Sequence, residues 1–272
     1  MTDPLSGCWA KLDRAESHIG ALHASIEEVS GDDLKSVPLR RKYEPEHEAV
    51  VYRVERAPQI RESWGLLIGD ALHNLRGSLD HLWWQLATSN LGREPTEKEA
   101  KDVQFPIFSK PGMWTGHRFL KYVDPKLANK IEPLQPYNAP AGQVYALGAL
   151  AVLANIDKHR LLHAVARPAA EGTFQMYPGP DDFHNCTLTP GRSIELNSLG
   201  TRPLKRGDEV FRVYVTPTGP NCDVDLNANL TAHITFHGDW DLPQSLNAMW
   251  SEVRGILTLF APYLEGPSMG HA

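Results

Sequence analysis

Four long segments of the chain repeat apolar residues every three or four positions, a spacing typical of amphipathic helices. We predict helices over Ser6–Val29, Ile60–Ser89, Gln143–Val165 and Leu242–Tyr263. The second of these has its apolar positions at Ile68, Leu72, Leu75, Leu79 and Leu82. Two shorter helical segments are predicted near His117–Tyr122 and over Asp124–Ile131, the latter with Asp124 as its cap and Pro125 at its first position.

Other segments alternate apolar and polar residues, as half-buried strands do. We expect one short strand, Ala49–Val54, within an otherwise polar loop from Gly31 to Pro58. An antiparallel meander of about four strands is predicted at Thr173–Tyr177, Ser193–Leu196, Glu209–Val215 and Leu230–Phe236.

This order of elements predicts an α+β fold, in which a helical bundle carries a small antiparallel β-sheet inserted before a C-terminal amphipathic helix. We expect a mainly helical region over residues 1–167, a strand region over 168–241, and a last helix over 242–264 that packs on the rest.

The charge, the cysteine content and the lengths of the apolar stretches exclude several classes of protein. A formal net charge of -6 and an isoelectric point near 6.0 argue against a globally basic nucleic-acid-binding surface, although a local basic patch is compatible with both. The three cysteines lack the paired spacing of a zinc site, which favours a reducing compartment without a disulfide framework. No apolar stretch approaches the roughly 20 residues that span a bilayer. We therefore expect a cytoplasmic protein without a membrane partner.

The segment Gly69–Trp84 concentrates ionisable residues on a predicted core helix. At about 100° per residue, its polar side chains share the face opposite the apolar stripe, with Arg76 at the boundary. Histidine titrates near neutrality, an aspartate can orient it, and an arginine can hold an anion, so such a face suits acid–base catalysis. The alternative is a solvent-facing side with intrahelical ion pairs. The candidate catalytic residues are His73, Arg76, Asp80 and His81.

A second charged cluster follows an apolar run late in the third predicted helix. Asn155, His159 and His163 stand four apart and would share one face. Cations at a helix end also interact favourably with the helix dipole, which is the structural alternative. The candidate substrate-binding residues are Asp157, Lys158, His159 and Arg160, and of these Lys158, His159 and Arg160 are the expected phosphate contacts.

Metal and cofactor signals are sparse. There is no Gly-rich phosphate loop and no His-Glu-x-x-His pair, so we expect neither a cofactor nor a bound metal. A metal-dependent bundle enzyme remains an alternative, with ligands drawn from His73, His81, His159 and His163 together with Asp70, Asp80 and Asp157.

The sequence Arg76-Gly-Ser-Leu-Asp-His81 resembles the signature of HEPN domains, all-helical modules that include metal-independent endoribonucleases of toxin and phage-defence systems. The resemblance covers at most the helical part, about Ser6 to Ala166. It implies a homodimer in which the Arg and His of two protomers face each other, Arg76 binding the scissile phosphate and His81 transferring protons. A cognate antitoxin is a further partner that the resemblance leaves open.

The primary hypothesis is therefore a metal-independent endoribonuclease acting on RNA. In HEPN nucleases a polar residue usually follows the Arg, whereas Gly77 stands here. The family also gives no account of the C-terminal strands. A catalytically inactive protein that binds nucleotides, RNA or another protein is the alternative from a different functional class.

Overall fold

The computed structural model of the chain describes residues 3–140, 145–169, 179–192, 194–197, 199, 202–226, 228, 230–236 and 240–264. Its contacts divide the chain into two compact units, each assembled from segments far apart in sequence. Unit 1 consists of Met1–His23, Ser63–Leu162 and Leu242–Ala272, and unit 2 of Ala24–Glu62 and His163–Asp241. The sequence predicted regions that are each continuous along the chain. In the structure, each unit combines separate segments, and the segments of the two units alternate along the chain.

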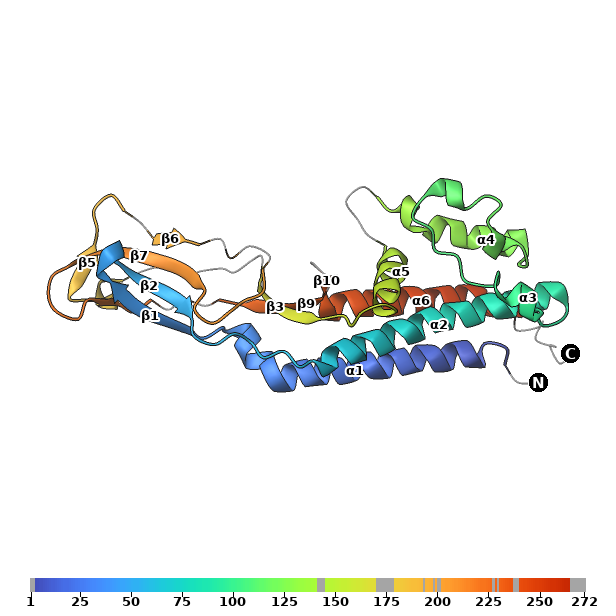
Figure 1. The fold of residues 1–272 in the computed structure, drawn as a ribbon, viewed down its shortest axis with the longest axis horizontal. Coiled ribbons are helices and arrows are strands. Elements are labelled where there is room, and N and C mark those ends of the chain that lie inside the picture. The colour runs from blue at the N-terminus through green and yellow to red at the C-terminus, as the bar shows by residue number, and fades with distance from the viewer. Residues whose placement is uncertain are drawn as a thin grey trace, which may run out of the picture. The chain divides into compact units, whose positions relative to one another are not determined.

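The described residues form six α-helices, with short 3-10 turns and strands in the connections between them (Figure 1). No helix among them has the length and apolar content needed to cross a membrane. Together with antiparallel strands, the helices confirm the α+β class. The helices are α1 (Ser6–Lys35), α2 (Ser63–Leu91), α3 (Glu97–Ala100), α4 (Pro125–Ile131), α5 (Ala146–Asp157) and α6 (Leu242–Leu264).

Helix α2 forms the centre of unit 1. Its predicted apolar stripe is fully buried, and α2 packs against α5 and α6, which also pack against each other. Ser78 of α2 is buried as well and donates a hydrogen bond to the carbonyl of Cys8 in α1. As predicted, Asp124 caps α4 by accepting from the backbone N–H of Lys126 at 2.8 Å.

Ten short strands form three sheets in the described residues. The largest has the order β1-β2-β7-β5, with β6 also paired to β7, and the others are β10-β9-β3 and β4-β8. The strands are β1 (Leu39–Glu44), β2 (Ala49–Val54), β3 (Ala164–Pro168), β4 (Phe183–His184), β5 (Cys186–Leu188), β6 (Ile194–Leu196), β7 (Glu209–Pro217), β8 (Asp223–Val224), β9 (Ala232–Phe236) and β10 (Trp240–Asp241).

The pairing expected of the local meander is confirmed between β6 and β7, which are antiparallel neighbours, and is wrong for β7 and β9, which belong to different sheets. The long strand β7 pairs with β2, which lies far upstream in the chain, and β9 pairs with β3. The expected strand β2 has the predicted bounds, but its flanking loop holds a second strand, β1, that the prediction missed. The predicted strand Thr173–Tyr177 lies outside the described residues.

The predicted helix Gln143–Val165 is also wrong in its second half. Helix α5 ends at Asp157, and Ala164–Pro168 is a strand paired antiparallel to β9. The apolar residues after the charged run fit a strand as well as a helix, and pairing with a distant segment decides between the two. Asn155, His159 and His163 consequently do not share a helical face.

Unit 2 has a core of its own, built on the inner face of the β1-β2-β7 sheet. Tyr52 of β2 stacks on Phe211 of β7 with ring centroids 4.2 Å apart. The buried Tyr52 hydroxyl donates to the carbonyl of Val224 and accepts from the N–H of Leu226 at 2.8 Å. The hydroxyl thus joins this sheet to β8.

Two leucines of α2 test the packing of unit 1. Leu79 is fully buried and Leu66 is 61% exposed. We expect Leu79→Ala to lower the free energy of unfolding by about 2–5 kcal/mol because it leaves a cavity. Leu66→Ala, on the same helix, should change it by less than about 0.5 kcal/mol. Denaturant unfolding followed by circular dichroism measures both, and equal losses would contradict the observed face of α2.

Candidate functional site

Arg76 and Asp80 stand one turn apart on α2 and together hold the backbone of Phe105. Arg76 Nη2 donates to the Phe105 carbonyl at 2.7 Å, and the Phe105 N–H donates to Asp80 Oδ1 at 3.0 Å. The two side chains also form an ion pair, with Nη2 and Oδ1 separated by 3.0 Å. Phe105 is fully buried, so these bonds satisfy backbone groups that would otherwise lack a partner. Arg76 and Asp80, two of the four residues predicted as catalytic, therefore have a structural role.

The segment that follows Phe105 is fixed from a second side by Gln135. This fully buried amide accepts from the N–H of Phe108 at 2.7 Å and donates to the carbonyl of Pro106 at 3.1 Å. The Phe108 ring in turn contacts His117 and Phe119, at 4.5 and 6.4 Å between ring centroids. Hydrogen bonds and ring contacts thus give this connection a defined conformation.

A groove of about 660 Å³ lies between this connection and one side of α5. Its volume is within the range of small-molecule sites. Small residues of α5 leave the space open, and aromatic and aliphatic side chains form most of its wall. The lining residues are Arg76, Gln104, Phe105, Ile107, Phe108, Ser109, Met113, Phe119, Pro136, Gly148, Ala151, Val152, Ala154, Asn155, Ile156 and Lys158.

Two cations line this groove, and they come from the two clusters that the sequence suggested. Lys158 follows the end of α5, is exposed, and forms no ion pair with the described residues. Arg76 is mostly buried, with 14% of its side chain exposed, and is paired with Asp80. The groove therefore combines apolar walls with one free and one paired cation.

His81 faces a different element from Arg76. A side chain at Gly7 of α1 would place its Cβ 3.3 Å from His81 Nδ1, so His81 lies against the start of α1. Gly77 likewise faces α1, with the Lys11 side chain 3.4 Å from its Cβ position. Arg76 lies in the groove and His81 is outside its lining. Within one chain the predicted pair does not converge on one site.

The two charged clusters do meet at Asp157. Its carboxylate lies over Gly69 of α2, where a Cβ would be 2.6 Å from Oδ1. Burial, and then the charge of Asp70, raise the pKa of Asp157, while the charge of His73 lowers it. The predicted catalytic residue His73 and the predicted substrate contact Asp157 are therefore neighbours.

The remaining predicted substrate contacts, His159 and Arg160, are exposed in the turn after α5 and lie outside the groove lining. The metal alternative gains no support from the pooled His and Asp residues. In the part of the chain that the structure describes, Glu44, Glu46 and His47 form the one group close enough to share an ion, and none of these was predicted. Glu44 is already paired with Arg53.

Sequence reasoning missed the groove wall. The connection containing Phe105–Phe108 is rich in proline and aromatic residues. An exposed loop does not need so many aromatic side chains. This aromatic content is the one sequence signal that could have indicated a buried, functional segment. Its position against α5 depends on Arg76, Asp80 and Gln135, which are distant in sequence.

Comparisons with known proteins add no assignment: no protein-family model, curated protein or solved structure matches the chain. The function must therefore be argued from the site itself.

The clamp on Phe105 predicts a stability role for Arg76. We expect Arg76→Ala to lower the free energy of unfolding by about 1–3 kcal/mol because a buried carbonyl loses its donor. In a double-mutant cycle with Asp80→Ala, the two losses should be non-additive by about 0.5–3 kcal/mol. Chemical denaturation measures the cycle. Unchanged stability in both single variants would show that the clamp contributes nothing.

The raised pKa of Asp157 predicts that this residue affects the stability of the protein in a pH-dependent way. Its folded-state pKa lies above the unfolded value, so its contribution to stability falls as the pH rises through that window and stays unfavourable at neutral pH. Asp157→Asn should therefore raise the melting temperature at pH 7, and the gain should shrink as the pH falls below the ordinary aspartate pKa. Removing a negative charge from a helix C-terminus adds to the gain, by about 0.5 kcal/mol.

Thermal unfolding across this pH range measures the difference from wild type. Asp13→Asn, at an exposed position of α1, is the matched control and should show no such pH-dependent gain. A lower melting temperature for Asp157→Asn at pH 7 would contradict the unfavourable environment of the carboxylate.

Proposed function

We propose that unit 1 binds a nucleotide-class ligand, either a free nucleotide or an exposed nucleotide of RNA, in the groove between α5 and the Phe105–Phe108 connection. The observation that carries the proposal is the meeting of Lys158 and Arg76 with aromatic and aliphatic walls in one groove of about 660 Å³. Sites for such ligands are mostly apolar with a few polar groups that fix orientation.

Lys158 is the phosphate contact in this proposal, because it is exposed and without an ion pair in the described residues. Arg76 contributes less, since Nε and Nη2 already bond to Asp80 and Phe105. Its Nη1 has no hydrogen bond to the described residues and is the guanidinium nitrogen left to donate to a ligand. The apolar wall accommodates the base.

Metal-independent RNA cleavage is the second candidate, and the observation that favours it is the position of Arg76 in a groove with a second cation. Cleavage by Arg76 and His81 would require His81 of a second copy to reach the groove, since His81 of the same chain lies against Gly7. The homodimer, a role in toxin or phage-defence systems, and an antitoxin belong to this second candidate. A cytoplasmic location suits both candidates and is supported by three free, buried cysteines.

Binding is tested by calorimetric titration with adenosine monophosphate and by anisotropy with a labelled oligoribonucleotide. Lys158→Ala should weaken binding about tenfold because a hydrogen bond to a charged group is lost. Lys98→Ala, an exposed lysine of α3, is the matched control and should leave affinity unchanged. Val152→Trp should block the groove without harming the fold, since Val152 is 51% exposed, whereas Leu66→Trp outside the groove should have no effect.

Absence of binding to both probes, or equal affinity of wild type and Lys158→Ala, would overturn the nucleotide proposal. The same oligoribonucleotide incubated with EDTA separates the two candidates. Cleavage that His81→Ala abolishes would establish the second candidate, and an intact oligonucleotide with retained binding would leave a binding protein.

A further inference from the structure

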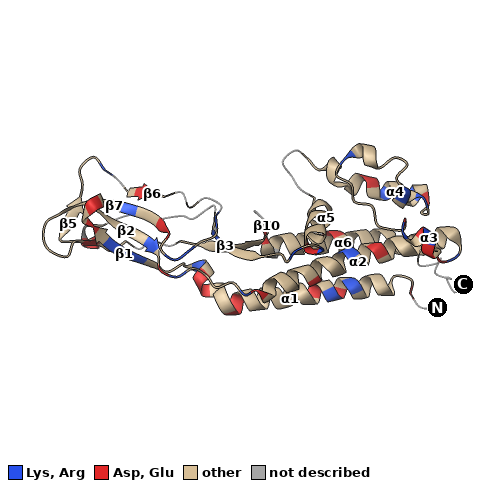
Figure 2. Ribbon diagram, viewed as in Figure 1, with Lys and Arg blue, Asp and Glu red and all other residues tan. Residues whose placement is uncertain are grey.

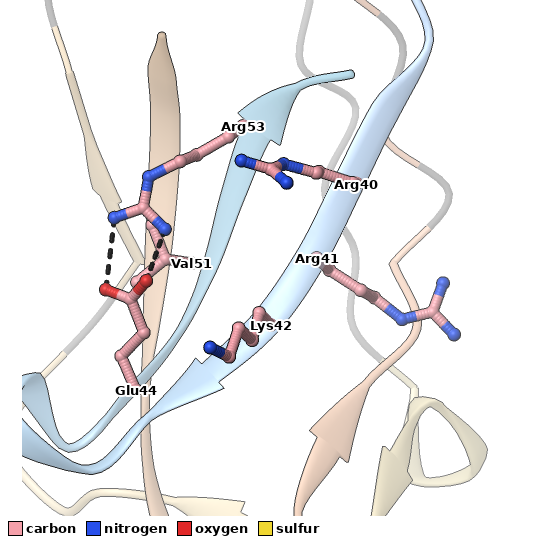
Figure 3. Close-up of a pocket in the computed structure, with 6 residues that line it drawn as sticks. All are labelled: Arg40, Arg41, Lys42, Glu44, Val51 and Arg53. Carbon is pink, nitrogen blue, oxygen red and sulfur yellow. Dashed lines mark hydrogen bonds and ion pairs between the residues drawn. The ribbon is translucent and has the colours of Figure 1, made fainter. Parts of the chain in front are cut away.

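A second groove, of about 290 Å³, lies in unit 2 on the β1–β2 hairpin (Figure 3). It is lined by Arg40, Arg41, Lys42, Glu44, Val51 and Arg53. Four of these six side chains are cations and one is a carboxylate, on a protein whose formal net charge is -6. Figure 2 shows the Lys and Arg positions of β1, β2 and β7 beside acidic positions of the same sheet. The groove is thus a local basic site on an acidic protein.

The strand register places like charges opposite each other. In the antiparallel β1–β2 pair, Arg40 lies opposite Arg53, and Lys42 opposite Val51. Side chains of alternate residues share one face of a strand, so Arg40, Lys42 and Arg53 lie on the same face. Directly opposed like charges destabilise a sheet. An anion bound between them would remove this cost.

Carboxylates compensate only part of the charge. Arg53 bonds to both oxygens of Glu44 and also to Glu209 at 3.2 Å. Figure 3 shows Arg41 directed away from this group, and its guanidinium pairs instead with Asp223 and Asp225. Arg40 and Lys42 are exposed and form no ion pair with the described residues. The charge of Lys42 contributes to lowering the pKa of Glu44, after the larger effect of Arg53. Two cations therefore face solvent without an ion-pair partner among the described residues.

The same sheet face carries an aromatic side chain. Tyr214 of β7 lies opposite Ala49 in the β2–β7 register, and Ala49 is on the face of Lys42 and Arg40. The Arg192 guanidinium lies over the Tyr214 ring, 4.6 Å from its centroid. Basic grooves accompanied by aromatic side chains are the usual surface for single-stranded nucleic acids.

We propose that this face of the β1-β2-β7 sheet binds the phosphodiester backbone of a single-stranded nucleic acid through Arg40 and Lys42. These residues stand about 6.8 Å apart along an extended strand, so each can contact a separate phosphate of an extended chain. A membrane surface fits less well, because interfacial binding also needs apolar side chains and the groove offers only Val51. This site is independent of the nucleotide groove of unit 1, with which it shares no residue.

The experiment measures binding of a labelled oligouridylate by fluorescence anisotropy at several salt concentrations. The Arg40→Gln/Lys42→Gln double variant should bind more weakly, and the slope of log affinity against log salt should become shallower by about 1.4, which corresponds to two lost phosphate contacts on a single strand. Lys205→Gln/Arg206→Gln changes the net charge equally at exposed positions of unit 2 outside the groove, and should keep the wild-type slope.

Three results would overturn the proposal: no oligouridylate binding by the wild type, an unchanged slope in the Arg40/Lys42 variant, or an equal loss in the Lys205/Arg206 control. Stronger binding of the wild type to phosphatidylserine vesicles than to the oligonucleotide would also overturn it, in favour of a membrane. Self-association of the Arg40/Lys42 variant without a change in binding would assign these cations to edge-strand protection instead. The Arg40→Gln/Lys42→Gln variant should keep the wild-type affinity for adenosine monophosphate, which separates this site from the groove of unit 1.

Discussion

The backbone of Phe105 is buried where no strand or helix partner is available, and unit 1 depends on how its two polar groups are satisfied. Arg76 and Asp80 supply the donor and the acceptor from one turn of α2. Because they bond to each other as well, their own charges are compensated at the same time. The connection that they hold forms one wall of the groove opposite α5. Arg76 thus both holds the backbone of Phe105 and lines the candidate binding groove.

Periodicity predicted most of the fold. It located α1, α2 and α6 because each buries one stripe of side chains along its length, whereas α4 was located by its cap Asp124 and by Pro125. It failed where a segment's partner lies far away in sequence. The sequence of β3 fits a continuation of α5, and only its pairing with β9 makes it a strand. Strand β1 lacks apolar alternation because Arg41, on the same face as Leu39 and Tyr43, is charged and pairs with Asp223 and Asp225.

The candidate site, like the fold, was predicted in part, and the unpredicted part depends on contacts between distant segments. Sequence reasoning found Arg76, Asp80 and Lys158 because ionisable residues on core helices are conspicuous, and two of these line the groove. It could not assign their partners, since the helical positions alone do not show that Arg76 meets Phe105 while His81 meets Gly7. The groove walls come from a connection whose conformation depends on non-local hydrogen bonds. Residue types can be read directly from the sequence, whereas a binding site also depends on contacts between residues that are far apart in the sequence.

The interleaving of the two units has a consequence for synthesis. Unit 2 has all its segments once residue 241 has left the ribosome, whereas unit 1 still lacks α6, which packs on α2 and α5. The apolar faces of α2 and α5 that α6 covers are therefore exposed while the second segment of unit 2, His163–Asp241, is translated. Transiently exposed apolar surface promotes aggregation in large proteins. During this interval the nascent chain would depend on chaperones more than its finished form does.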